Sequence, residues 1–198
     1  MKRLVMLALV LAFGISCDDS PTSPSDSNVA KFTAILLPSN EVPAVTNADA
    51  TASGTMQLTM TVTRDGGNNI TGATYDFNVN YTGFPANTTL TGAHIHAGSA
   101  GNNAPVVVGV PLTASDAALP TGQAMMTKTG LNSTSATMSA ATVAQGIFNN
   151  PSGNYFNVHT SLNPGGAIRG PDRDGLARQS AGCLFGRVPG ADPTGAPG

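Results

Sequence analysis

The sequence predicts an all-β fold, an antiparallel β-sandwich or barrel of about seven or eight strands. Three observations support this prediction. Short segments between residues 30 and 171 alternate apolar with polar side chains, which is the period of a half-buried strand. Clusters of Gly, Pro, Asn and Asp separate these segments. The 23 glycines and 14 prolines among 198 residues also leave little room for long helices.

The first 16 residues have the features of a secretory signal peptide. A short basic start, Met1-Lys2-Arg3, precedes an apolar run from Leu4 to Ile15. That run is too short to span a bilayer, which takes about 20 apolar residues, and it suits an export signal. The following Ser16-Cys17 resembles the bacterial lipobox, although Gly14 stands where that motif prefers Leu. The resemblance implies an exported lipoprotein, anchored to a membrane through a lipid on Cys17 and facing the periplasm or the cell surface. The alternative is an ordinary cleaved signal and a secreted protein.

Two segments flank the predicted domain. Residues 17–29 are rich in Ser, Pro and Asp, a composition typical of a flexible linker. Residues 172–198 show neither a strand nor a helix period, so we expect a disordered tail. Lipidation of Cys17 would leave Cys183 as a single cysteine; without it, a disulfide between them would join the two tails.

A β-hairpin is the clearest local prediction. In residues 55–63 the apolar side chains fall on one face and Thr or Gln on the other. Residues 65–69, Asp-Gly-Gly-Asn-Asn, form a turn signal, because Gly and Asn tolerate positive φ. Residues 73–81 then alternate again, with aromatic and valine side chains on one face.

The remaining elements are shorter. Residues 143–148 are compatible with a single helical turn. Further strands are predicted at residues 32–37, 88–96, 106–110, 124–129, 155–160 and 167–170.

Several local patterns occur together in this predicted β domain. In chain order they read Phe32-Thr33-Ala34, Asn40-Glu41-Val42-Pro43, Gly92-Ala93-His94-Ile95-His96-Ala97-Gly98, Tyr155-Phe156-Asn157-Val158-His159-Thr160 and Gly166-Ala167-Ile168-Arg169-Gly170. They resemble the CHRD (chordin-type) domain over nearly all of residues 30–170. The resemblance implies an immunoglobulin-like or superoxide-dismutase-like β-sandwich without an established biochemical activity. Family members usually continue with Gln-Leu after the last glycine, whereas this chain continues with Pro171-Asp172.

All three histidines lie in these motifs. His94 and His96 are two residues apart, so a strand places both rings on one face. If the strand carrying His159 is a neighbour, the three rings can form a three-His site with an open position, suited to Cu or Zn. Glu41 or Asp76 would then accept a hydrogen bond from a ring N–H.

A purely structural role for these residues is the alternative. His94 and His96 would hydrogen-bond the backbone of the loop at residues 98–105, and His159 that of the turn at residues 163–166. Arg169 would form a bidentate salt bridge with Glu41.

Composition and motifs exclude several functions. A net charge of −2 gives no basic footprint for nucleic acid. Copper,zinc superoxide dismutases use six histidines to hold their metals, whereas this chain has three, so that activity is not expected. Glu41 is the only glutamate, so a two-carboxylate glycosidase is not indicated either. No sequence signature marks a catalytic nucleophile, and we expect no enzymatic activity.

Two functions remain. The first is a lipid-anchored surface binding or structural module whose Thr- and Asn-rich faces contact an unknown surface protein or carbohydrate. The second is a metal-binding protein of the periplasm or cell surface that holds Cu or Zn through His94, His96 and His159.

Overall fold

The computed structural model of the protein describes residues 28–99, 101–170 and 177–178. The predicted signal segment, the lipidation site Cys17 and Cys183 lie outside the described residues, as does most of the predicted linker and tail. None of the described helices is long and apolar enough to cross a membrane.

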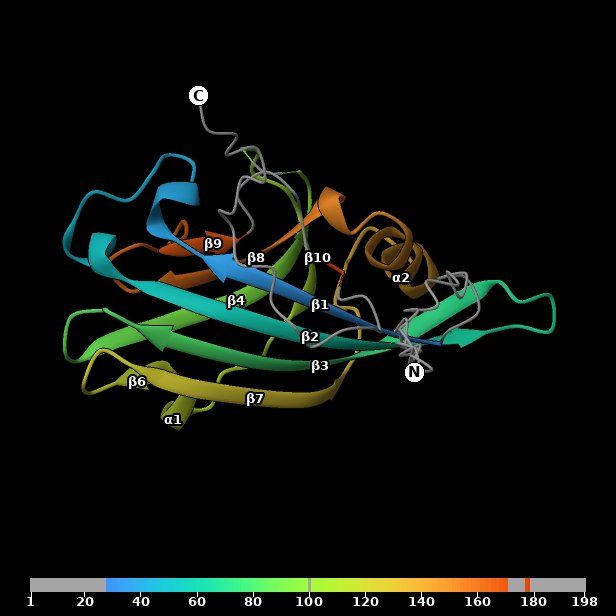
Figure 1. Ribbon diagram of the computed structural model, residues 1–198, viewed down its shortest axis with the longest axis horizontal. Helices are drawn as coiled ribbons and strands as arrows, with labels where there is room; N and C mark the ends of the chain where they lie inside the picture. The colour runs from blue at the N-terminus through green and yellow to red at the C-terminus, as the bar shows by residue number, and fades with distance from the viewer. Residues whose placement is uncertain (1–27, 100, 171–176, 179–198) are drawn as a thin grey trace, which may run out of the picture.

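Two antiparallel sheets pack face to face, which confirms the predicted all-β sandwich (Figure 1). The first sheet has the strand order β10 (Ala177–Arg178), β1 (Val29–Leu36), β2 (Ser53–Arg64), β3 (Ile70–Thr82) and β7 (Ala124–Leu131). The second has the order β5 (Val106–Gly109), β4 (Thr88–Ala97), β8 (Asn154–Thr160) and β9 (Ile168–Gly170), with β6 (Ala118–Leu119) pairing to the start of β4. Every pairing between these strands is antiparallel.

The core lies between the two sheets and follows the predicted alternation. In β2 the side chains of Met56, Leu58 and Met60 are buried, whereas Gln57 and Thr59 between them face outward. Phe77 of the first sheet meets Phe156 of the second with ring centroids 5.7 Å apart. Burial of apolar surface between the sheets is therefore the main stabilising contribution.

The predicted hairpin is present as β2 and β3. The Asp65 carboxylate accepts hydrogen bonds from the backbone N–H groups of Gly67 and Asn69, and Asn68 has a left-handed φ of 66°. The ladder extends from Ser53 to Arg64, beyond the predicted residues 55–63, because the flanking backbone continues to pair after the alternation weakens.

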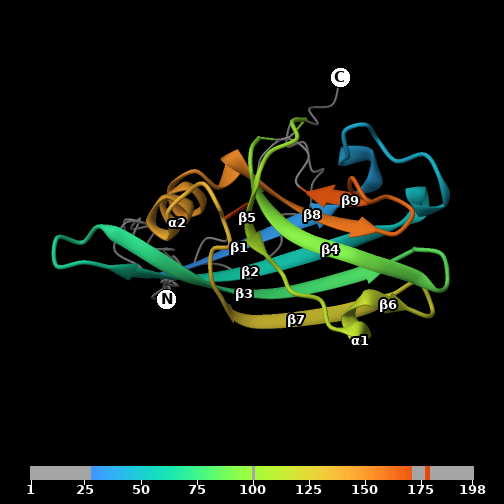
Figure 2. The same ribbon diagram turned by 180° about the vertical axis from the view of Figure 1, so that it is seen from behind.

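The helical segment is longer than the single turn predicted at residues 143–148. Helix α2 (Ala140–Asn149) begins after Ser139, whose side chain accepts a hydrogen bond from the Thr142 N–H. Its buried stripe of Val143, Ala144, Ile147 and Phe148 closes one end of the sandwich (Figure 2). Tertiary burial compensates for the weak helix propensity of its Thr, Val and Gly residues.

The other helical segments are short. They are α1 (Ala114–Ala117) and the 3₁₀ turns η1 (Pro38–Asn40), η2 (Ala48–Thr51) and η3 (Pro151–Gly153).

Two edge contacts were not predicted. Residues 177–178, within the expected disordered tail, pair as β10 with Phe32 and Thr33 of β1. Leu37 also bridges to Arg169 through N–H···O distances of 2.9 and 3.1 Å, which links the end of β1 to β9. This link brings the loop after β1, with Glu41, to the outer face of the second sheet.

Candidate metal-binding site

The three histidines share the outer face of the second sheet. Strands β4 and β8 are antiparallel neighbours, with His94 opposite Asn157 and Gly92 opposite His159. The intervening side chains, among them Ile95 on β4, point into the core. The strand period thus places all three imidazoles on the face away from the core.

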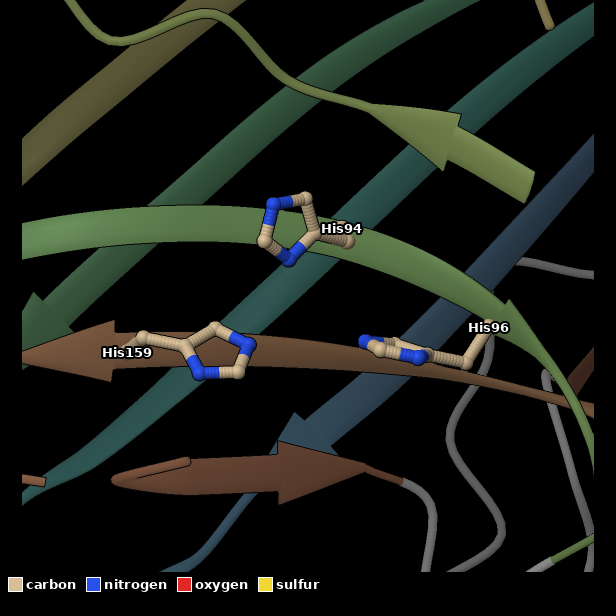
Figure 3. A group of neighbouring side chains, drawn as sticks. All are labelled: His94, His96 and His159. Atoms are coloured by element: carbon tan, nitrogen blue, oxygen red, sulfur yellow. The ribbon is translucent and has the colours of Figure 1, made fainter. Parts of the chain in front are cut away.

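The rings converge on one point. One ligand nitrogen from each histidine lies within 4.8 Å of the other two. Figure 3 shows the rings of His94, His96 and His159 arranged around a common centre, each turning a nitrogen inward. Nδ1 of His94, Nε2 of His96 and Nε2 of His159 are buried and have no hydrogen-bond partner among the described residues.

The other ring nitrogen is bound to the backbone in two of the three histidines. His96 Nδ1 lies 2.7 Å from the carbonyl oxygen of Ala104, and His159 Nδ1 lies 2.9 Å from that of Pro164. A carbonyl can only accept, so each Nδ1 carries the proton and each Nε2 presents its lone pair. The backbone contacts that sequence reasoning offered as an alternative therefore orient two rings as potential ligands.

The pKa values of the histidines favour the neutral form that binds metals. Burial lowers the pKa of His94 from 6.5 to about 4, assisted by the neighbouring His159 and His96. Burial also lowers the pKa of His96 and of His159, and the positive charge of Arg169 acts in the same direction. At neutral pH the cluster therefore consists of three uncharged imidazoles.

Aromatic packing fixes one side of the cluster. The Tyr155 ring stacks on His96, with centroids 4.7 Å apart and an interplanar angle of 6°. The Arg169 guanidinium carbon lies 4.2 Å from the centre of the same tyrosine ring. The Tyr155 hydroxyl accepts a hydrogen bond from the N–H of Ala104, whose carbonyl binds His96.

A buried ion pair lies behind this stack. Arg169 Nη2 is 3.1 Å from Glu41 Oε2, and both side chains are almost fully buried. The other Glu41 oxygen and Arg169 Nε have no hydrogen-bond partner within the described ranges, so the expected bidentate geometry is wrong. The remaining guanidinium contacts go to the Asn102 carbonyl and the Asn103 side chain, because the loop before β5 folds over Arg169.

The expected carboxylate acceptors for the ring N–H groups are also wrong. Asp76 lies on β3 in the other sheet and accepts a hydrogen bond from the Gly130 N–H. Glu41 binds Arg169, and burial raises its pKa to about 7 despite the lowering effect of Arg169 and Asn157. Carbonyls of the nearby loops take the place of a carboxylate, because those loops fold back beside the rings.

Two pockets adjoin these residues. One of about 510 Å³ lies between β5 and residues 131–134 and has His94 in its wall. The other, of about 340 Å³, lies beside Glu41 between residues 42–47 and 162–166. The sequence analysis named Asn157 only as part of the motif at residues 155–160; its complete burial beside His94 was not predicted.

Comparison with known proteins gives one match. The sequence model of the CHRD domain family matches residues 32–171. No curated protein and no solved structure matches the chain. The matched region contains all three histidines together with Glu41, Tyr155 and Arg169.

Proposed function

The chain belongs to the CHRD domain family, and we propose that it is an exported protein that binds one copper or zinc ion through His94, His96 and His159. The observation that carries this proposal is the convergence of three buried imidazole nitrogens that have no hydrogen-bond partner in the part of the chain that the structure describes. Buried polar atoms without partners are costly, and a bound cation would satisfy all three nitrogens.

The donor set suits these two metals. Neutral imidazole is a good ligand for zinc and copper, and three-His sites keep a further position open. Zinc–nitrogen bonds of about 2.0–2.1 Å place tetrahedral ligands roughly 3.4 Å apart. The nitrogens, which lie within 4.8 Å of one another, would close inward by small ring movements. Such a protein holds or buffers the ion, and copper would add one-electron chemistry.

Titration of the metal-free chain tests this proposal. We expect calorimetry with Zn²⁺ to give one ion per chain, and Cu²⁺ to compete for the same site. His96→Ala should abolish the tight binding. A wild-type chain that binds neither ion would overturn the proposal.

Export and anchoring form a separate part of the proposal. The basic start, the short apolar run and Cys17 support a lipidated, membrane-anchored form. Expression of the full chain in a bacterium should place it in the membrane fraction, and Cys17→Ser should release it. Equal fractionation of the two forms would favour a secreted protein.

A surface module remains the second candidate function. The outer face of β2 carries Thr55, Gln57, Thr61 and Thr63 exposed to solvent, a neutral surface rich in hydrogen-bonding groups. Such a face suits contact with a protein or carbohydrate at little electrostatic cost. A partner captured equally by wild-type protein and by His94→Ala would favour this function over metal binding.

A further inference from the structure

Asn157 lies beside the histidine cluster in the second sheet. On β8 it stands two residues before His159 and two after Tyr155, so all three side chains share the outer face. Across the ladder it is directly opposite His94. Side chains opposite each other on one face have Cβ atoms about 4.5–5.5 Å apart. The register therefore places Asn157 next to His94, on the face of the sheet that carries the three rings.

The Asn157 side chain has an unpartnered oxygen. The residue is only 1% exposed, and its Oδ1 is buried with no hydrogen-bond partner among the described residues. The three histidine nitrogens that face the centre of the cluster share this property. Four buried nitrogen and oxygen atoms thus occur on neighbouring positions of two strands without a hydrogen-bond partner in the described part of the chain.

The orientation of the amide follows from Glu41. A side-chain hydrogen bond from Asn157 lowers the pKa of the Glu41 carboxyl group. A carboxylate accepts, so the amide NH₂ must face Glu41. The opposite arm of the amide, Oδ1, is then directed away from Glu41. The salt bridge to Arg169, at 3.1 Å, holds Glu41 in this position.

We propose that Asn157 Oδ1 is the fourth ligand of the metal site, which makes it a three-His, one-oxygen centre. This inference rests on the proposed function and deepens it. The ion would pair all four acceptors, and Glu41 with Arg169 would act as positioning residues that keep the oxygen turned toward it. Four ligands with an amide oxygen suit Zn²⁺, Co²⁺ or Cu²⁺.

Cobalt spectroscopy tests the assignment. The chain without residues 1–17 would be loaded with Co²⁺, whose visible d–d bands report coordination number, and Zn²⁺ competition would give the affinity. We expect Asn157→Ala to weaken Zn²⁺ binding by about tenfold or more, to alter the bands and to make them sensitive to azide. Asn157→Asp keeps an oxygen at this position although it loses the NH₂ group that faces Glu41, and it should bind Zn²⁺ more tightly than Asn157→Ala. Asn80→Ala, at an exposed asparagine of β3, is the matched control.

Melting curves of the metal-free variants separate ligand loss from unfolding. A folded Asn157→Ala protein with wild-type affinity and wild-type bands would overturn the role of Asn157 while leaving the three-His site intact. Failure of the wild-type chain to bind any of these ions would overturn the proposed function itself.

Discussion

Gly92 leaves the space that the His94 imidazole fills. A Cβ atom at residue 92 would lie 2.7 Å from Cε1 of His94 and 3.6 Å from Cδ2 of His159. The first separation is shorter than van der Waals contact allows. The convergence of the cluster therefore depends on a strand position that carries no side chain.

Gly92→Ala should displace the His94 ring. We expect the affinity for Zn²⁺ to fall by about tenfold or more while the protein stays folded, because the added methyl group meets a half-buried ring. Gly72→Ala on β3 is the control, since a Cβ there meets nothing within 4 Å. Competition titration and circular dichroism check the two variants. Equal zinc affinity in both would contradict this role of Gly92.

Loss of Arg169 should destabilise the fold. Arg169→Leu leaves Glu41 buried without its ion-pair partner, which typically costs about 3–5 kcal/mol in the free energy of unfolding. Urea denaturation of the metal-free protein measures the difference. Wild-type stability of the variant would show that the pair is dispensable.

The loss of unfolding free energy in Arg169→Leu should depend on pH. The folded pKa of Glu41 is already raised to about 7, and removal of Arg169 takes away a lowering influence. A raised carboxyl pKa means that the folded protein holds a proton that the unfolded chain releases above about pH 4.5. Stability of Arg169→Leu relative to wild type should therefore fall as pH rises through 7. If the stability difference between wild type and Arg169→Leu became smaller between pH 6 and pH 8, the raised pKa of Glu41 would be contradicted.

Metal affinity should persist to unusually low pH. Three histidines with ordinary pKa values near 6.5 would lose roughly 50-fold in affinity between pH 7.5 and pH 6, through competition with protons. Here burial lowers all three pKa values, that of His94 to about 4. We expect a loss of less than about tenfold over this range, measured by zinc competition. A 50-fold loss would show that the histidines titrate normally.

Metal removal should lower the thermal stability. A ligand that binds only the folded state raises the free energy of unfolding by about 2.7 kcal/mol when its free concentration is 100 times its dissociation constant. Added Zn²⁺ should therefore raise the melting temperature, and a chelator should return it to the metal-free value. His159→Ala should melt at one temperature with or without zinc, which separates this site from nonspecific binding.

The parts of the fold with a clear side-chain period were predictable, and those that depend on tertiary contact were not. The alternation of apolar residues with threonine identified β2, because it buries one face only. Helix α2 was underestimated, since its Gly146 and Thr142 weaken the local helical signal that burial restores. Strand β10 has two residues and exists through pairing with β1. A segment this short has no period to detect.

The histidine cluster was partly predictable for the same reason. The spacing of His94 and His96 puts both rings on one face, but the adjacency of β4 and β8 is a property of the topology. The division of the His96 and His159 rings into one backbone-bound and one inward nitrogen depends on loops whose course the sequence does not specify. The role proposed for Asn157 depends likewise on its position opposite His94.

The metal content of the purified protein tests the central claim most directly. The chain without residues 1–17 would be purified with no metal-binding tag and with Cys183→Ser, which removes its remaining thiol. Elemental mass spectrometry for Cu, Zn, Ni and Fe would then be compared with His94→Ala and His159→Ala. The account predicts about one equivalent of copper or zinc per chain, lost in both variants, because each removes one of three converging ligands. A chain without metal, whose melting temperature does not rise with micromolar Cu²⁺ or Zn²⁺, would contradict it.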